Sequence, residues 1–218
     1  MAQVAGPTAA LAGVPAGLQA QGVWSGRRQI FVRFAAEAET ATMYTADALA
    51  NELRRSTTRS SYHSISISGR DPLSNVDYLL AVFSKPPVDL PIMLDTDGQR
   101  PEAIAGLKKF VGLTQVTLEG NTLDASTERG LQTLRAAAEA GMQHALVLCS
   151  SDQTSDAQLL RIVEQARGVS GATQIVIHPP PGAPVDRDRR WMTLLERAAA
   201  LHNDVRFALK LPPPTGMR

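Results

Sequence analysis

The 218-residue chain has little cysteine and no long apolar run. Its one cysteine, Cys149, has no second cysteine with which to form an intrachain disulfide, and it cannot hold an iron–sulfur cluster by itself. Cys149 ends an apolar run, so we interpret it as a small hydrophobic residue at a strand end. No segment reaches the roughly 18 apolar residues of a transmembrane helix, so we predict no direct membrane insertion.

The chain also lacks a concentration of charge of either sign. It carries 22 Lys and Arg against 21 Asp and Glu, and the two signs are interspersed. Without a basic segment, no nucleic-acid partner is predicted. Residues 1–17 are rich in Ala, Gly and Pro and have no positive segment before an apolar stretch, so they make a poor signal peptide. We expect a cytoplasmic protein with one domain over residues 1–218, of which residues 1–17 form an extended N-terminal segment.

Short apolar runs alternate with amphipathic segments along the chain. This alternation predicts an α/β fold, with a parallel sheet and helices outside it. Six strand–helix units and a seventh strand are too few for a barrel of eight units, which takes about 250 residues, so we favour a partial (βα)6 TIM-like open barrel. A doubly wound open sheet is the alternative. The predicted strands are residues 29–34, 62–68, 91–95, 113–118, 143–149, 173–178 and 205–211, and the predicted helices are residues 45–55, 75–84, 101–110, 126–140, 155–167 and 186–202.

Ligands in such folds bind where the parallel strands end. The second predicted strand is followed by residues 68–72 (Ser-Gly-Arg-Asp-Pro), and the third by residues 95–98 (Asp-Thr-Asp-Gly). Taken singly, each segment is more typical of a turn than of a site. The only histidine directed toward such a pocket is His178, which could form an acid–base pair with Asp95 or Asp97.

Residues 19–35 resemble the opening of the 7-carboxy-7-deazaguanine synthases, a family of the radical S-adenosylmethionine (SAM) superfamily. That family begins with Gln-Gly-Glu-Gly, a Gly-Arg step and a strand reading Phe-Val-Arg-(Leu/Phe)-Ala. Here Gln21 stands in place of the Glu, Gly26-Arg27 gives the Gly-Arg step, and residues 31–35 read Phe-Val-Arg-Phe-Ala. The resemblance implies a partial open barrel of the radical SAM type.

The main departure from the family is the missing Cys-x3-Cys-x2-Cys motif, whose thiolates hold a [4Fe–4S] cluster. The matching positions are Glu37, Ala41 and Tyr44. Alanine has no donor atom, and glutamate and tyrosine offer hard oxygens where the cluster needs soft thiolates. We therefore expect a pseudoenzyme without a cofactor.

Other family positions also differ. Ala46 stands where the family has a Mg²⁺-binding Thr. The family's Gly-Gly-Glu-Pro motif corresponds to Gly69-Arg70-Asp71-Pro72 in this chain, and its C-terminal His and Lys correspond to Pro212 and Pro213. The bulky Arg70 is expected to crowd any remaining pocket. The residues predicted to line this vestigial pocket are Gln21, Arg27, Ser68, Gly69, Asp71, Thr96, Asp97, Gly98 and His178.

Three functions are compatible with these features. The leading hypothesis is a structural or regulatory subunit that binds a protein partner in a homo- or hetero-oligomeric complex. The second is a sensor that binds a SAM-like or pterin-like ligand without radical chemistry, and the third is a non-radical enzyme centred on His178. The proline-rich residues 179–184 and 212–214 are stiff segments that could either dock on a neighbour or face solvent.

Overall fold

The computed structural model describes residues 6–85 and 88–211. They form a sheet of ten strands, in the order β10-β9-β8-β7-β6-β5-β3-β1-β4, with β2 paired to β3. The strands are β1 (Thr8–Gly13), β2 (Ala16–Leu18), β3 (Arg28–Phe34), β4 (Thr42–Thr45), β5 (Ser64–Gly69), β6 (Ile92–Thr96), β7 (Val111–Glu119), β8 (Gln143–Cys149), β9 (Gln174–His178) and β10 (Val205–Phe207). The helices are α1 (Ala46–Arg59), α2 (Val76–Phe83), α3 (Ile104–Leu107), α4 (Leu123–Glu139), α5 (Asp156–Val169) and α6 (Arg189–Leu201), with 3-10 turns at Pro72–Asn75 and Pro101–Ala103.

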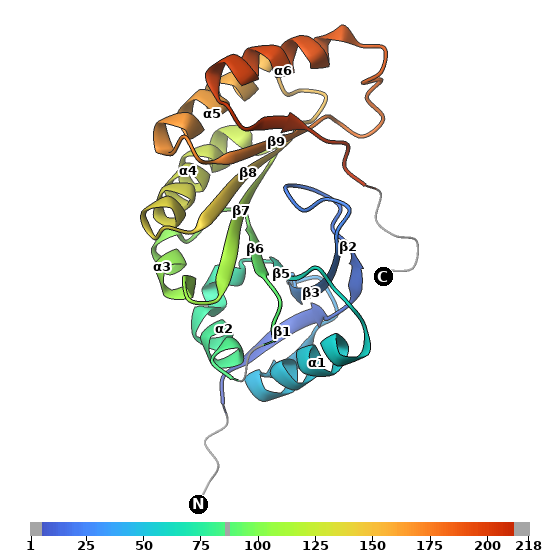
Figure 1. Ribbon diagram of the computed structural model, residues 1–218, viewed down its shortest axis with the longest axis vertical. Helices are drawn as coiled ribbons and strands as arrows, with labels where there is room; N and C mark the ends of the chain where they lie inside the picture. Colours follow the sequence, from blue (N-terminus) through green and yellow to red (C-terminus); the bar gives the residue numbers. More distant parts are fainter. Residues whose placement is uncertain (1–5, 86–87, 212–218) are drawn as a thin grey trace, which may run out of the picture.

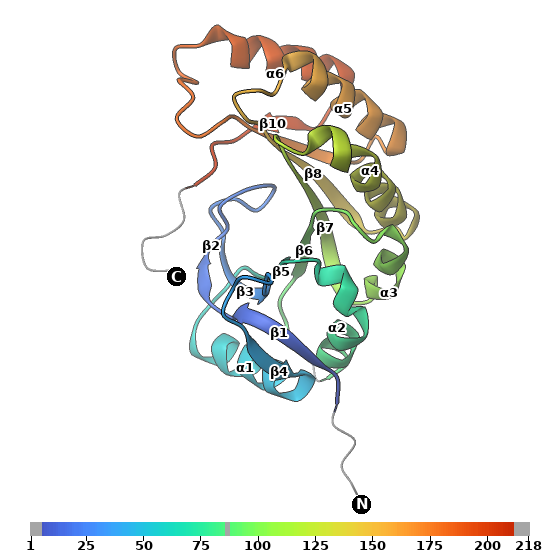
Figure 2. The same ribbon diagram turned by 180° about the vertical axis from the view of Figure 1, so that it is seen from behind.

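The parallel part of the sheet is wound in one direction. From β3 through β10, each described parallel strand pairs with the next parallel strand in the chain. A doubly wound sheet reverses its strand order, so that alternative was wrong. Figures 1 and 2 show a curved sheet with helices along its convex side and the β2–β3 loop on its concave side. This is an α/β fold compatible with an open barrel.

The convex face of the sheet carries most of the core. Helices α1, α2 and α3 cover a cluster that contains Ile30, Ile65 and Leu94, and helices α4, α5 and α6 cover a second cluster around Leu146 and Ile177. Apolar runs and apolar–polar alternations both indicate strands, which is why most parallel strands were predicted close to their observed bounds. Strand β8 was predicted without error.

The N-terminal region differs from the prediction. Strands β1 and β2 lie in residues that were not assigned to any strand, and both pair antiparallel with β3. Strand β4, also not predicted, pairs with β1 and forms an edge of the sheet. Only Ala9 and Leu11 are buried in β1, and such a short, small-residue alternation gives a weak strand pattern. Residues 1–5 lie outside the described part of the chain.

Three further differences concern single segments. The predicted helix over residues 101–110 shrinks to a 3-10 turn and α3, because the chain must return to the sheet at Val111 and Gly106 favours helix weakly. The last strand ends at Phe207, because the following residues turn toward the β2–β3 loop, where the Leu211 N–H donates to the Ala20 carbonyl at 2.9 Å. Pro179 and Pro180 are buried, so these two neither face solvent nor offer a docking surface, and residues 212–214 lie outside the described residues.

No helix among residues 6–85 and 88–211 combines the length and the apolar character that crossing a membrane requires.

Candidate functional site

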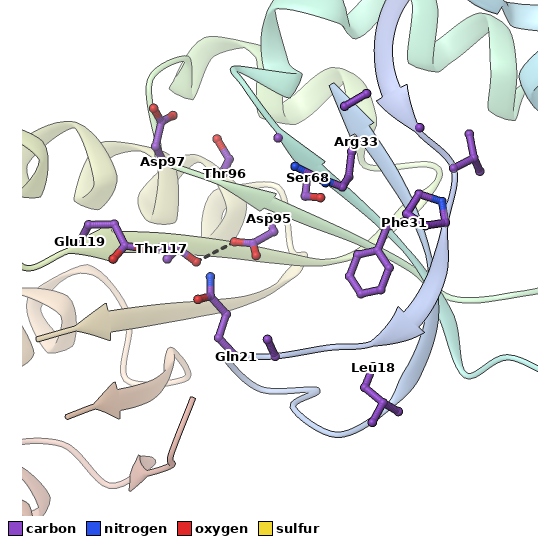
Figure 3. Close-up of a pocket in the computed structure, with 16 residues that line it drawn as sticks. Leu18, Gln21, Phe31, Arg33, Ser68, Asp95, Thr96, Asp97, Thr117 and Glu119 are labelled. Atoms are coloured by element: carbon purple, nitrogen blue, oxygen red, sulfur yellow. Dashed lines mark hydrogen bonds between the residues drawn. The ribbon is translucent and has the colours of Figure 1, made fainter. Parts of the chain in front are cut away.

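A cavity of about 700 Å³ opens where β3, β5, β6 and β7 end (Figure 3). The bend between β1 and β2 closes one side of it, and the beginning of the β2–β3 loop closes another. This is the edge of the sheet at which the sequence predicted ligands to bind. The lining residues are Ala12, Gly13, Val14, Pro15, Leu18, Ala20, Gln21, Phe31, Arg33, Ser68, Gly69, Asp95, Thr96, Asp97, Thr117 and Glu119.

The two sides of the cavity differ in polarity. Leu18 and Phe31 lie together on one side, whereas Asp95 and Glu119 lie on the other (Figure 3). The lining contains three carboxylates and one guanidinium, that of Arg33, which already pairs with Glu39 outside the cavity at 3.1 Å. The cavity therefore presents an apolar wall opposite an acidic one.

Asp95 is the most buried of the three carboxylates. Its Oδ1 accepts a hydrogen bond from the Thr117 hydroxyl at 2.6 Å, and Gln21 points toward it from the β2–β3 loop (Figure 3). Burial raises the pKa of Asp95 above its usual value, although the Thr117 hydrogen bond opposes this change. A carboxyl with a raised pKa can exchange a proton with a ligand at milder pH than a surface aspartate.

The loop between β2 and β3, residues 19–27, forms part of the cavity wall, and we call it the strap. Its two ends are joined by hydrogen bonds from Gln19 N–H to the Arg27 carbonyl and from Gly26 N–H to the Gln19 carbonyl, both 2.8 Å. Between them, Val23 and Trp24 pack on the concave face of the sheet. The strap thereby covers apolar residues of β6 to β9 that would otherwise face the open side: Met93, Leu113, Ala145, Val147, Cys149 and Val176.

Glycine is strongly favoured at position 22 of the strap. Its φ is +77°, and a Cβ there would lie 2.0 Å from Gln115 Oε1. The close approach lets the Val23 N–H donate to that same oxygen at 3.1 Å. The positive φ and the close approach to Gln115 thus explain why glycine ends the Gln-Ala-Gln-Gly sequence of residues 19–22.

His178 contacts the strap and forms no pair with either aspartate. Its Nε2 accepts a hydrogen bond from the Gly22 N–H at 2.9 Å, and its Nδ1 donates to the Ala208 carbonyl at 2.6 Å. The side chain is 1% exposed, and burial lowers its pKa below 6.5. Since both ring nitrogens are engaged, the predicted pair with Asp95 or Asp97 is not formed.

Five of the nine predicted pocket residues line the cavity: Gln21, Ser68, Gly69, Thr96 and Asp97. The other four are placed elsewhere. Arg27 is exposed on the strap, Asp71 pairs with Arg100 at 2.9 Å, Gly98 packs on the Gly130 backbone of α4, and His178 holds the strap.

Arg70 is exposed and lies outside the lining residues, so the expected crowding of the cavity was wrong. Arg33, Thr117 and Glu119 also line the cavity, although they were not among the predicted pocket residues. Thr117 and Glu119 alternate with Gln115 along β7, and this polar face of an otherwise apolar strand was the signal that could have identified them.

The positions that match the cluster cysteines do not form a ligand set. Glu37 and Ala41 are exposed, and Tyr44 lies in β4, where it pairs with Ala9 and packs against the convex core. Glu39 stabilises the intervening turn by accepting from the Ala36 N–H at 3.0 Å and from Arg33. One carboxylate, one phenol and one methyl group do not fit an iron–sulfur cluster. Within the described ranges, no three His, Cys, Asp or Glu side chains gather as metal ligands.

Cys149 does not substitute for these positions. It lies at the end of β8, is buried, and its Sγ is 3.8 Å from Gln21 Oε1. Burial, with a smaller contribution from Glu119, raises the pKa of this thiol to about 12. The thiolate that a metal or an electrophile needs is therefore disfavoured.

The chain matches no protein-family model and no curated protein sequence. The resemblance of residues 19–35 to the 7-carboxy-7-deazaguanine synthases therefore stays a prediction from the sequence.

Proposed function

We propose that this chain is a pseudoenzyme with a partial (βα)6 barrel of the radical SAM type, and that it acts as a structural or regulatory subunit of a protein complex. The proposal has two parts, the loss of radical chemistry and the role as a subunit. They are tested separately because the first can hold without the second.

The first part of the proposal, the loss of radical chemistry, is supported by the three positions that match the cluster cysteines of the family. Residues 37, 41 and 44 carry no thiol, and two of them point to solvent while Tyr44 contributes to the core. The core and strap are well packed at the same time, with fully buried apolar side chains on both faces of the sheet. We expect a well-packed fold without cluster ligands when selection maintains a protein for binding and not for catalysis.

Anaerobic reconstitution with iron and sulfide tests this part. We expect no cluster absorption band and no protein-bound iron after desalting. As a matched control, the same assay is run on the triple variant Glu37→Cys, Ala41→Cys, Tyr44→Cys, which restores the spacing of the motif. Iron and labile sulfide bound by the unmodified chain would overturn the proposal.

Purification of the tagged chain from its native source under mild conditions tests the subunit role. We expect a species larger than the 23.3 kDa chain, with a partner in fixed stoichiometry that persists through sizing. A monomer, recovered over a range of salt concentrations, would overturn this role.

A second candidate function is supported by the cavity. It is large enough for a ligand of drug size and combines an apolar wall with a few polar groups, as small-molecule sites do. Five residues predicted from the family resemblance line it. This candidate is a sensor that binds a SAM-like or pterin-like ligand without radical chemistry.

Thermal unfolding with SAM, S-adenosylhomocysteine or 6-carboxypterin tests the sensor. A ligand that binds only the native state raises Tm in proportion to the logarithm of its concentration. We expect such a rise in the unmodified chain and a smaller one in Asp95→Asn, which keeps the acceptor for Thr117 but removes the carboxylate from the cavity. No change in Tm with all three compounds would exclude this ligand class.

A further inference from the structure

The strap is attached to the sheet by few polar contacts. On the β9 side its hydrogen bond runs from the Gly22 N–H to His178 Nε2, and on the β7 side it runs from the Val23 N–H to Gln115 Oε1. Val23 and Trp24 add apolar contacts to small clusters on the concave face. Two longer contacts involve sulfur, from Gln19 Nε2 to Met93 Sδ at 3.9 Å and from Cys149 Sγ to Gln21 Oε1 at 3.8 Å. One of the contacts between the strap and the sheet is thus made by a histidine, a side chain that can bind a proton.

The geometry at His178 requires the neutral ring. Nδ1 carries the proton, because its neighbour at 2.6 Å is the Ala208 carbonyl, which can only accept. The lone pair is consequently on Nε2, where it accepts from the Gly22 N–H at 2.9 Å. Protonation would place a second N–H on Nε2 opposite the Gly22 N–H, so that two donors would face each other at a site that is 1% exposed.

We propose that His178 is a pH-sensitive latch: the neutral imidazole holds the strap on the concave face, and its protonation releases the strap at Gly22. Ala20 and Gln21, which precede Gly22, line the cavity described above. Acidification therefore changes the shape of the cavity as well as the position of the strap. The inference rests on the strap contacts and not on the proposed function, so either can fail alone.

The charged and titratable groups around His178 come from three elements. Glu119 at the end of β7 favours the protonated ring, and Lys210 on the segment after β10 disfavours it. Cys149, the register partner of His178 on β8, stays neutral because its pKa is about 12. Burial is the largest influence and lowers the pKa of His178 below 6.5.

The direction of the effect follows from this lowered pKa. The unfolded or released state binds the proton more readily than the latched state, so latching is complete above about pH 6.5 and weakens as the pH falls below that value. A strap that opens on alkalinisation would contradict the mechanism.

Trp24 provides the readout, because it lies in the strap. The chain has two tryptophans, and the Trp191→Phe variant leaves Trp24 as the single emitter. Acrylamide quenching of its fluorescence is measured from about pH 8 to about pH 5, the range in which histidine titrates. We expect the quenching constant to rise about threefold on acidification as the released state becomes populated, with unchanged far-ultraviolet circular dichroism.

Two variants assign the transition to a particular histidine. His178→Gln can accept from Gly22 and donate to Ala208 but does not titrate, so we expect low quenching at every pH. His63→Gln is the matched control, because His63 stacks edge-on against Trp24 with ring centroids 4.9 Å apart, and its pKa is also lowered by burial and by Arg27. We expect His63→Gln to keep the transition.

A flat profile in the Trp191→Phe protein, or a transition that His63→Gln abolishes and His178→Gln retains, would overturn the latch. If His178→Gln does not fold, NMR of the otherwise unmodified chain decides the matter. The latch predicts that the Gly22 amide resonance and the His178 ring resonances shift with the same midpoint. Independent midpoints would reject it.

Discussion

The two faces of the sheet are built in different ways. The convex face is covered by helices α1 to α6 and forms two large apolar clusters, in which strands and helices bury one another. The concave face has two small clusters, against which Val23 and Trp24 of the strap and Ala208 after β10 pack, and it carries the polar side chains that line the cavity. The convex face therefore supplies most of the hydrophobic stability, while the concave face depends on one loop.

The residues that stabilise the fold thus lie mainly on the convex face, whereas the residues that could bind a ligand lie on the concave face. A residue on the convex face is fixed by neighbours on several elements, so its replacement leaves a cavity. A residue under the strap has a loop as its main cover, and a loop can shift to fill lost volume. The predictions that follow compare matched positions on the two faces.

The largest effect is expected for leucine-to-alanine changes at two fully buried positions. Leu146 lies in the convex cluster and Leu113 under the strap, and both are 0% exposed. Leu146→Ala should lower the free energy of unfolding by about 3–5 kcal/mol, and Leu113→Ala by about 2–3 kcal/mol, because the strap can move into the vacated space. Urea unfolding followed by circular dichroism measures both. Equal losses would mean that the strap is as rigid as the helical layer.

A second comparison uses two glycines within the strap. Gly22 and Gly26 have φ of +77° and +78°, but a Cβ at position 22 would meet Gln115, whereas at position 26 it meets no atom within 4 Å in the described part of the chain. Both alanine variants bear the backbone strain of about 1–2 kcal/mol. Gly22→Ala should lose more than Gly26→Ala and raise acrylamide quenching of Trp24 at neutral pH. If the two variants unfold at the same urea concentration, the close approach to Gln115 is not important for docking.

The sequence predicted the convex face well and the concave face poorly, for a physical reason. Continuous apolar runs such as residues 145–149 are buried wherever the strand is placed, so pattern alone identifies them. The cavity residues at the ends of β5 and β6 followed from the rule that ligands bind at carboxyl ends. The roles of Gly22 and His178 could not be derived, since they depend on a contact between residues 156 positions apart.

A smaller effect is expected on the acidic wall. The pKa of Asp95 is raised in the folded protein above its ordinary value of 3.8. Ionisation of this carboxyl therefore opposes folding at pH values above 3.8. Asp95→Asn keeps an acceptor for Thr117 and should increase the free energy of unfolding at pH 7. The gain should shrink as the pH falls below the raised pKa of Asp95 and vanish below about pH 3.8, where the carboxyl is protonated in the folded and the unfolded chain alike. A loss of stability at pH 7 would show that the carboxylate has partners that compensate its burial.

The smallest effect is expected at Glu39, which pairs with Arg33 while both side chains are more than a third exposed, at 40% and 44%. Exposed ion pairs contribute at most about 1 kcal/mol, so Glu39→Gln should leave the urea midpoint nearly unchanged. The variant does, however, remove the charge that neutralises the one cationic residue among the described cavity-lining side chains. If the cavity binds a ligand, Glu39→Gln should alter affinity for anionic compounds more than for neutral ones, as isothermal titration at low and high salt would measure. A large loss of stability would instead show that the turn before β4 stabilises the fold. The edge of the sheet would then contribute to stability together with the convex face.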